Sequence, residues 1–378
     1  MSLVLDEHRE YLEDKARLSA YRRAINETVG PDDVVLDLGC GTGILGLLAS
    51  KAGARQVYSV DDSGMAQLAR DIGRANHVGN RVSVIKGLST RIDLPEQADV
   101  VVADQIGRFG FEAGVLEYFA DARRRLLKPS ARAVPARIDL WVALVEHAPQ
   151  WKKVDFWRRK SAGFSFEPAR VIAHNTGYPV RLQSRHLLGD PVAGASLDSL
   201  SHGANPIVFS RTMNVERAGT LHGVGGWFDA QLSPNVRMSN SPLDKRRIGR
   251  RNVFFPIAQP VSVATGDRVE VAFNILPVDM IVTWKVEVHT AGNPVARFIH
   301  STLKGMLISR EDLLHTNPDS VPTISVWGIA RRTVLELCDG KRTLAQIEDG
   351  VLRGHPDLFP TRSEAAVFAA EVITRYAR

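Results

Sequence analysis

A glycine-rich turn flanked by acidic residues is the stretch of the sequence most suited to chemistry. Residues 35–43 read Val-Leu-Asp-Leu-Gly-Cys-Gly-Thr-Gly, with Asp37 two positions before the first glycine, and the next apolar strand ends at Asp61. Such a turn can bring backbone N–H groups to the pyrophosphate of a dinucleotide. A carboxylate before the turn would repel that anion but suits the ammonium of S-adenosylmethionine, and Asp61 could accept bonds from two ribose hydroxyls. The pattern favours a class I methyltransferase over a dinucleotide enzyme or a turn that binds no ligand.

The segments around this turn alternate between strand and helix. Apolar runs predict strands, and helical periodicity predicts helices between them: strands at 34–37, 57–60, 82–85 and 98–103, helices at 44–52 and 65–76. Continuous apolar strands separated by helices indicate a parallel sheet that is covered on both faces. A charged amphipathic segment at 5–27 predicts one further helix ahead of the sheet. The first part of the chain is therefore expected to be an α/β domain.

The pattern changes after Pro135. Strand-like alternation now dominates, as in an antiparallel β sandwich or barrel, at 138–145, 223–230, 252–257, 268–275 and 280–288. Residues 163–221 are irregular and rich in Gly, Pro and Ser, which suggests an excursion from that sheet structure. From about Leu307 the chain becomes helical again and ends in a helix at 364–376. We therefore expect three domains, at 1–135, 136–306 and 307–378.

The composition is that of an ordinary soluble globular protein. The 378 residues are 44% hydrophobic and 24% charged, with a formal net charge of +6, and this length suits two or three domains. No apolar run approaches the roughly 18 residues of a membrane span, and early acidic residues argue against a signal peptide. The two cysteines, Cys40 and Cys338, cannot build a disulfide framework, so a cytoplasmic protein is expected. The spacing of metal ligands or of nucleic-acid-binding modules is not found.

Several motifs together resemble the protein arginine N-methyltransferases over about residues 8–300. The likeness is carried by short segments in the family's order: 37–45, 49–54, 57–63, Leu126-Leu127-Lys128-Pro129, Phe156-Trp157 with Gly163-Phe164, Trp227-Phe228-Asp229, Ser239-Asn240-Ser241-Pro242 and Gly266-Asp267. The resemblance implies a Rossmann-like methyltransferase domain followed by an antiparallel β barrel. It also implies a homodimer formed by a helical arm that is inserted in the barrel, which we place near 166–188.

The resemblance also assigns residues to the cofactor, S-adenosyl-L-methionine. It places Arg17 on the cofactor carboxylate, and Asp37 with Gly39 on the amino-acid part. Asp61 falls on the ribose. The other positions that the family pattern places along the cofactor are Cys40, Gly41, Leu88 and Ser89. The segment 87–90 lies at the adenine, where Thr90 stands in place of the family's usual glutamate.

The resemblance implies that two acidic residues on the loop after the fourth strand carry the chemistry. Asp104 and Glu112 are the candidates in this sequence. A guanidinium is a poor nucleophile because its lone pairs are delocalised and it is cationic. Two carboxylates can grip it bidentately and aim one nitrogen at the donor methyl group. Such positioning can supply on the order of 7–11 kcal/mol. Asp104 is one methylene shorter than the family's glutamate, and the loop is one residue shorter.

Another departure concerns substrate recognition. The family's Thr-His-Trp motif, expected just before Val253, is replaced by Arg247-Ile248-Gly249-Arg250-Arg251, and the Tyr-Phe-x-x-Tyr motif expected ahead of His8 is missing. Three interpretations remain open. Arg247, Arg250 or Arg251 binds a carboxylate of the substrate, with Tyr11 as a further substrate residue. The nucleophile is a group other than guanidinium. Or these arginines point to solvent.

The segment from 307 extends beyond the family's usual barrel end. Residues 334–343, followed by Ile347, resemble the small winged-helix peptide-binding domains of peptide-maturation pathways. The physical content of the pattern is a helix, an Asp-Gly turn and a second helix opened by Thr343. Such a domain would deliver a peptide substrate, and a helical cap with no partner is the alternative.

Three functions remain under consideration. The leading one is S-adenosylmethionine-dependent N-methylation of a guanidino group, in a protein, a peptide or free arginine. The second is methylation of another nucleophile, such as an imidazole or carboxylate of a natural-product precursor. The third is a catalytically silent adaptor that binds a peptide. Membrane and nucleic-acid partners are not expected.

Overall fold

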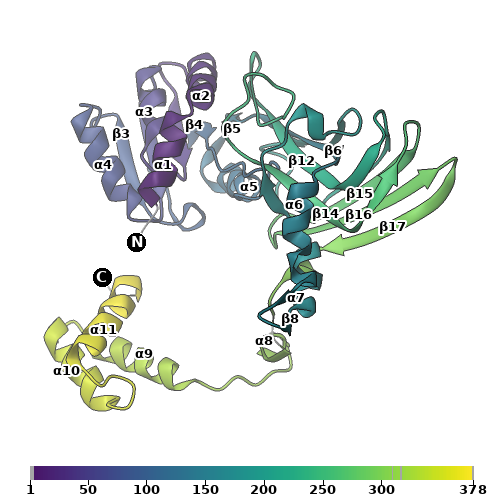
Figure 1. Ribbon diagram of the computed structural model, residues 1–378. Helices are drawn as coiled ribbons and strands as arrows, with labels where there is room; N and C mark the ends of the chain where they lie inside the picture. Colours follow the sequence, from purple (N-terminus) through teal and green to yellow (C-terminus); the bar gives the residue numbers. More distant parts are fainter. Residues whose placement is uncertain (1–3, 309, 316, 377–378) are drawn as a thin grey trace. The chain divides into compact units, whose positions relative to one another are not determined.

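The computed structural model describes residues 4–308, 310–315 and 317–376. The chain forms two compact units, residues 1–306 and 307–378. The first contains a parallel and an antiparallel sheet region, and the second is helical (Figure 1).

The parallel sheet begins the first unit and has the strand order β3-β2-β1-β4-β5. Its strands are β1 (Val34–Leu38), β2 (Gln56–Asp61), β3 (Val82–Lys86), β4 (Ala98–Val102) and β5 (Leu127–Val134). The intervening helices are α3 (Ile44–Lys51), α4 (Met65–Ala75), the short η1 (Ser89–Arg91) and α5 (Val115–Arg125). β1 is fully buried, which explains its continuous apolar sequence. The strand order reverses beside β1, and ligands of such sheets bind at the carboxyl ends of the strands there.

Two helices, not one, precede the sheet. The expected single helix over 5–27 is wrong, because the chain breaks at Asp14 between α1 (Val4–Glu13) and α2 (Lys15–Thr28). The carboxylate of Asp14 accepts a 3.1 Å hydrogen bond from the backbone N–H of Arg17 and so caps α2. Hydrophobic periodicity continues across this break, so it gave no sign of the cap.

The antiparallel region consists of two sheets. The first has the order β10-β6-β12-β14-β9, with β13 paired to β12, and the second has the order β11-β15-β16-β17. The strands are β6 (Arg137–Val145), β9 (Tyr178–Val180), β10 (Val192–Asp198), β11 (Ile207–Asn214), β12 (Gly219–Ser233), β13 (Val236–Ser239), β14 (Asn252–Val263), β15 (Arg268–Leu276), β16 (Ile281–Thr290) and β17 (Asn293–Ser301). The expected barrel is therefore not closed by hydrogen bonds. Residues 163–221 are also more regular than expected, because β9, β10 and β11 pair with strands of these sheets.

A segment made of short elements projects from the antiparallel region (Figure 1). It comprises α6 (Ala148–Val154), η2 (Asp155–Arg158), β7 (Lys160–Ser161), β8 (Phe164–Ser165) and α7 (Glu167–His174). The segment thus begins well before the 166–188 range expected for an inserted arm. Residues 178–188 instead return to the sheet, where β9 pairs with β14 and Leu187 bridges to Val145. The remaining short helices are η3 (Ser184–His186) and η4 (Thr302–Gly305).

The second unit is helical and comprises α8 (Arg310–His315), α9 (Val326–Leu337), α10 (Leu344–Gly354) and α11 (Arg362–Tyr376). Of these helices, α9, α10 and α11 pack against one another around a shared core. Ala330, Val334, Ile347 and Val351 are buried at its centre. Thr343 opens α10 through a capping box with Gln346, as the helix–turn–helix pattern predicts. Among the described residues of this unit no strand is present, so the wing of a winged-helix domain is missing from them. No helix of the described chain has the length and apolarity to cross a bilayer.

Candidate functional site

The glycine turn between β1 and α3 is held in a conformation that side chains disfavour. Gly39, Gly41 and Gly43 have φ values of 65°, 53° and 78°, where residues with a Cβ are strained. A Cβ at Gly39 would clash with the side chain of Gln105, and one at Gly41 with the ring of His8. The loop after β4 and helix α1 therefore both lie against the turn.

Asp37 lies beneath this turn and is fully buried. Its Oδ2 atom accepts hydrogen bonds from the backbone N–H of Gly46, at 2.9 Å, and from the hydroxyl of Ser59, at 3.2 Å. Its Oδ1 atom is buried without a partner. Burial raises the pKa of Asp37 to about 7. The carboxyl group therefore has one free acceptor, which is suited to a cationic donor.

Asp61 and the segment after β3 lie on the other side of the turn. The Asp61 carboxylate accepts 2.9 Å bonds from the backbone N–H of Gly41 and of Ser63, so this residue also anchors the turn. The segment containing Leu88 and Ser89 is tied to Asp61 by a 3.0 Å backbone bond from Gly87. Leu88 is exposed, at 42% of its surface. The candidate cofactor residues of β1, β2 and β3 are thus brought to one edge of the sheet.

An ion pair on α5 supports the Leu88–Ser89 segment from behind. Arg125 donates a 2.8 Å bond to the carbonyl of Ser89 and pairs with Asp121. Asp121 is 8% exposed, although its helical spacing suggests an exposed face. The sequence pattern gave no signal for this support, because Asp121 and Arg125 are separated by one helical turn and meet the segment only in the fold.

Asp104, which follows β4, is surrounded by three side chains, two from α2 and one from the segment before β14. Its carboxylate forms an ion pair with Arg17 of α2. It forms a second ion pair, at 3.2 Å, with Arg250, which precedes β14. The hydroxyl of Tyr21 donates a 3.0 Å bond to its other oxygen. Burial alone would raise the pKa of Asp104, but the guanidinium groups of Arg250 and Arg17 hold it below its ordinary value. Asp104 is therefore an ionised carboxylate that already carries two guanidinium partners.

Glu112 has a different environment, made by its own loop. Its carboxylate accepts bonds from the backbone N–H groups of Arg108, at 3.0 Å, and of Phe109, at 2.8 and 2.9 Å. No ion pair with a cation involves it among the residues that the structure describes. Burial raises the pKa of Glu112, and these backbone bonds offset the increase only in part.

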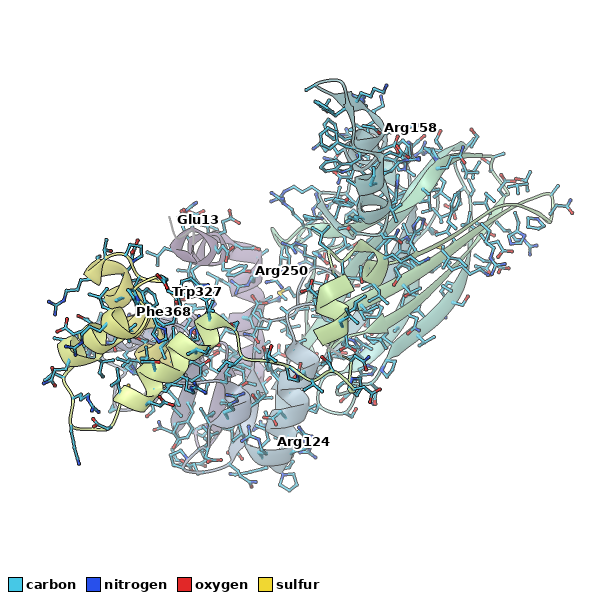
Figure 2. The ribbon with its side chains drawn as sticks, turned by 90° about the horizontal axis from the view of Figure 1, so that it is seen from below. Glu13, Arg124, Arg158, Arg250, Trp327 and Phe368 are labelled. Atoms are coloured by element: carbon cyan, nitrogen blue, oxygen red, sulfur yellow. The ribbon has the colours of Figure 1, made fainter. Side chains whose placement is uncertain are left out.

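A cavity of about 770 Å³ brings the two acids together, next to α1 and α2. Of the candidate substrate residues, Tyr11, Arg250 and Arg251 line it, whereas Arg247 does not: its guanidinium donates to the carbonyl of Leu182 instead. Arg17 and Arg250 lie 4.7 and 5.6 Å from the centre of the Tyr11 ring. Figure 2 labels Arg250 and, on α1, Glu13, which also lines the cavity.

The cavity includes residues that sequence reasoning did not assign. Arg108, Arg181, Glu10 and Lys15 line it. Arg108 lies in the acidic loop and Arg181 directly follows β9, so only the pairing of β9 with β14 brings Arg181 near Arg251. That pairing has no sequence signal, because β9 is three residues long.

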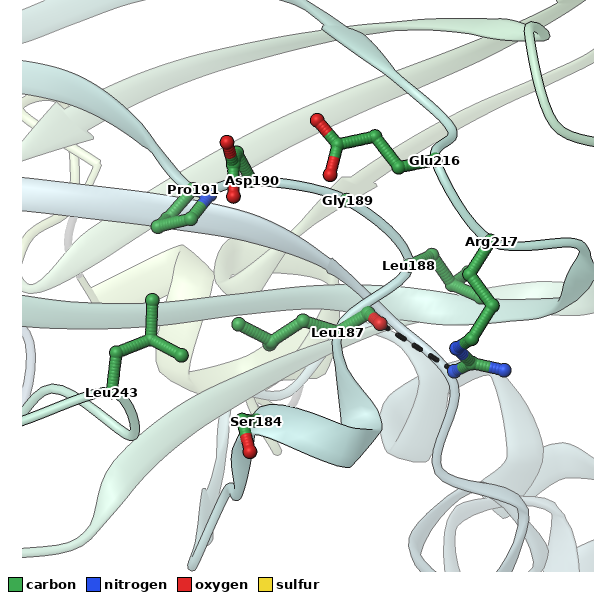
Figure 3. A pocket seen from close by; sticks show the side chains of 9 residues that line it. All are labelled: Ser184, Leu187, Leu188, Gly189, Asp190, Pro191, Glu216, Arg217 and Leu243. Carbon is green, nitrogen blue, oxygen red and sulfur yellow. Dashed lines mark hydrogen bonds between the residues drawn. The ribbon is translucent and has the colours of Figure 1, made fainter.

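A second, smaller pocket of about 220 Å³ lies in the antiparallel region. Figure 3 shows Asp190 and Glu216 on one side and Leu187 with Leu243 on the other. Arg217 donates a 3.5 Å bond to the carbonyl of Leu187 there. None of the candidate site residues lines this pocket, and no cluster of metal-ligating side chains occurs in the described chain.

Comparison with known proteins accounts for this arrangement. A family model described as ribosomal protein L11 methyltransferase (PrmA) matches residues 21–136. Among curated relatives, "Probable protein arginine N-methyltransferase 6" from Arabidopsis thaliana is 28% identical over 235 residues, which cover 60% of this chain and 54% of the relative. "Histone-arginine methyltransferase CARMER" from Drosophila erecta is 30% identical over 263 residues, which cover 63% of this chain and 48% of the relative. The chain is therefore similar to curated protein arginine methyltransferases. It spans about half the length of these relatives.

Solved structures of protein arginine methyltransferases share the fold. The Trypanosoma brucei PRMT1 enzyme–prozyme heterotetrameric complex with AdoHcy aligns with a TM-score of 0.69 at 21% identity, covering 78% of this chain and 96% of that one. Arabidopsis thaliana protein arginine methyltransferase 10 aligns with a TM-score of 0.68 at 22% identity, covering 79% and 98%. The expected fold class is confirmed: a Rossmann-like domain, an antiparallel β domain like that of these solved structures, and C-terminal helices.

Proposed function

We propose that this chain transfers the methyl group of S-adenosylmethionine to a nitrogen of a guanidino group. The observation that carries the proposal is the cavity that Asp104 and Glu112 both line, together with Arg17, the residue assigned to the cofactor carboxylate. The similarity to curated relatives that are named arginine methyltransferases supports the same activity.

The residues at the carboxyl edge of the parallel sheet fit the cofactor. Asp37 offers a buried, unpartnered Oδ1 atom, which suits an ammonium group, and Gly39 and Gly41 leave no room for a Cβ. Arg17 would bind the carboxylate, Asp61 the ribose and the Leu88–Ser89 segment the adenine. When bound, S-adenosylmethionine supplies an electrophilic methyl group on a sulfonium.

The two acids would position the nucleophile. Glu112 is fixed by backbone N–H groups, so its remaining lone pairs can accept N–H bonds from a substrate guanidinium and hold one nitrogen towards the methyl donor. Asp104 stays ionised and adds negative charge at the same position. A carboxylate of the cofactor at Arg17 would compete with Asp104 for that guanidinium, which releases Asp104 towards the substrate.

Methyl transfer from labelled S-adenosylmethionine tests the proposal. Free L-arginine, an arginine-rich peptide and a host-cell lysate serve as substrates, and amino-acid analysis of the product identifies the methylated group. We expect the label in methylarginine. Asp61→Ala should abolish cofactor binding in calorimetry, whereas Glu112→Gln should keep it. Tight cofactor binding with no label in any guanidino group would contradict the proposal and favour the catalytically silent adaptor.

Methylation of another nucleophile is the second candidate, and the pairing of Arg250 with Asp104 favours it. The guanidinium of Arg250 lies 3.2 Å from the Asp104 carboxylate and so already occupies part of the group that a substrate guanidinium would need. A neutral imidazole or a carboxylate in a precursor would meet less charge repulsion there. Label in an amino acid other than arginine would select this candidate.

We also propose that the projecting segment forms a homodimer. Phe164 and Val171 on it are 71% and 59% exposed, and Phe156 and Phe166 are 45% and 42% exposed. Figure 2 places Arg158 on this projection. Exposed apolar clusters of this kind mark association surfaces. Analytical ultracentrifugation at micromolar concentration should detect a dimer, and Phe164→Asp should convert it to a monomer. A monomeric parent protein would contradict the proposal.

A further inference from the structure

Three arginines on the cavity wall have no carboxylate to pair with. Arg108, Arg181 and Arg251 all line the cavity and are exposed. None of the three guanidinium groups has a hydrogen bond or an ion pair among the residues that the structure describes. They come from the acidic loop, from the end of β9 and from the residue before β14, so three segments place positive charge on one wall.

The acidic residues of the cavity are largely committed to other groups. Asp104 pairs with Arg17 and Arg250. Glu13 pairs with Arg9 at 2.9 Å. The carboxylate of Asp14 caps α2 and accepts a 2.7 Å bond from the backbone N–H of Gly249.

The remaining charges do not neutralise the arginine wall. Glu10 and Lys15 line the cavity with opposite charges, and Glu112 is bound by backbone N–H groups. The cavity lining thus carries six basic and five acidic side chains, and its positive charge is concentrated where Arg181 and Arg251 lie side by side at the ends of neighbouring strands. A substrate that presented only a guanidinium would be repelled by this wall. A substrate that also carried a carboxylate could place it against one or two arginines as a bidentate pair.

We propose that the substrate carries a carboxylate close to its guanidino group, and that Arg181 and Arg251 bind this carboxylate, with Arg108 beside them. This inference rests on the proposed methyl transfer and names the substrate class of that site. The carboxylate could be the α-carboxylate of free or C-terminal arginine, or the side chain of a neighbouring Asp or Glu in a peptide. Both sources supply the same planar anion.

Three matched substrate pairs test the inference and separate the sources. They are free arginine against agmatine, which lacks the carboxylate; a peptide ending in arginine as the free acid against its amide; and an internal arginine flanked by Glu against the same peptide with Gln. Transfer of labelled methyl gives kcat/KM, and calorimetry in the presence of S-adenosylhomocysteine gives affinity. We expect at least one pair to differ by about tenfold or more in favour of the carboxylate. The pair that differs identifies the source.

Charge-changing variants assign the effect to the arginines. Arg181→Gln and Arg251→Gln should each raise the KM of the carboxylate substrate about fivefold or more, with kcat and cofactor affinity unchanged. The matched partner without the carboxylate should be unaffected. Arg181→Glu should reverse the preference within the pair. Arg246→Glu is the control, because Arg246 is exposed in the same stretch but does not line the cavity and has no side-chain partner in the described structure.

The two possible failures give different results. A difference in affinity without methyl transfer would overturn the proposed function and leave the carboxylate site standing. Methyl transfer with equal kcat/KM and equal affinity within all three pairs would overturn the carboxylate site. A preference for the neutral or basic member of the pairs would overturn it as well.

Discussion

The two acids of the candidate site are held in opposite ways. Asp104 is held by side chains from two distant parts of the sequence: Arg17 and Tyr21 on α2, and Arg250 before β14. Glu112 is held by the backbone N–H groups of its own loop. The first arrangement exists only when the N-terminal helices, the parallel sheet and the antiparallel sheets have come together. The second forms within a few residues of chain.

The same contrast divides their chemistry. Neighbouring cations keep Asp104 ionised, whereas burial pushes the pKa of Glu112 upward. Asp104 connects the proposed cofactor and substrate parts of the site, because Arg17 and Arg250 both contact it. Glu112 is the acid without a cationic partner in the described chain, so the proposed substrate guanidinium would meet no competing cation at its carboxylate.

Glu112→Gln should have the largest effect on turnover. The substitution keeps the size of the side chain but removes the charge that would hold the substrate guanidinium, and removing one such stabilising group costs about a hundredfold to a thousandfold in rate. We expect kcat to fall by about a thousandfold while the affinity for S-adenosylmethionine changes less than about twofold. Single-turnover kinetics and calorimetry measure the two quantities.

Glu117→Gln provides the control for this variant. Glu117 is an exposed residue near the start of α5, five positions after Glu112 in the sequence, and does not line the cavity. It should leave the rate unchanged. If the Glu112→Gln enzyme kept nearly the turnover of the parent protein, Glu112 would not act on the substrate.

Asp104→Asn should have the largest effect on stability. It leaves the guanidinium groups of Arg17 and Arg250 largely buried without a counter-charge, and breaking a buried pair in this way costs about 3 kcal/mol. Urea unfolding of the cofactor-free protein should show this loss in the transition of the larger unit. The double variant Asp104→Asn/Arg250→Met should recover part of it, because one of the two unpaired cations is removed.

A loss of stability below about 1 kcal/mol would place Asp104 among ordinary surface ion pairs. The comparison between the two acids would then lose its basis, because Asp104 would no longer depend on the assembly of the three elements.

The pH dependence of methyl transfer should separate the two acids further. The pKa of Glu112 is raised and that of Asp104 is lowered, so Glu112 is the first to take up a proton as the pH falls. Below the pKa of Glu112, kcat/KM should fall about tenfold per pH unit with a slope of one, since one group titrates. Asp104→Asn should keep that slope. A slope of two would mean that a second carboxyl group titrates as well, either Asp104 or Asp37, whose pKa is about 7.

The effect of Glu112 on stability has the opposite direction. A carboxyl group whose folded pKa is raised binds its proton more tightly in the folded state. Its contribution to stability is therefore complete below the unfolded pKa and is lost as the pH rises through the folded pKa. The pH range that weakens catalysis through Glu112 is thus the range in which this group favours the fold.

The sequence predicts features that depend on neighbouring residues, and it does not predict contacts between distant segments. The glycine turn and the strands around it are contiguous, so their pattern indicated the parallel sheet and the residues at its edge. The likeness to the family supplied Asp104 and Glu112. Contacts between distant segments carried no local signal: Arg250 on Asp104, Arg181 beside Arg251, and Arg125 behind Ser89.

The antiparallel region shows the same limit. β10 and β11 lie in a stretch rich in Gly, Pro and Ser, and their strand character depends on pairing with β6 and β15. The break at Asp14 was hidden for a related reason. An Asp inside an amphipathic pattern is compatible with an exposed helical position as well as with a helix cap.

Asp14→Ala should have the smallest of the expected effects. It tests whether Asp14 helps to position Arg250, the partner of Asp104. Asp14 caps α2 and also accepts the 2.7 Å bond from Gly249, directly before Arg250. Loss of a cap costs about 1 kcal/mol. Loss of the bond to Gly249 should loosen Arg250 and Arg251, so we expect the substrate KM to rise about threefold, a shift of less than 1.4 kcal/mol.

Ser325→Ala removes the cap of α9 in the other unit, where Ser325 accepts a 3.1 Å bond from Gly328, and should leave KM unchanged. If both variants lower stability and neither changes KM, the tie from Asp14 to Gly249 serves the fold alone, and Arg250 is held by Asp104 and Gly107 without help from α1 and α2.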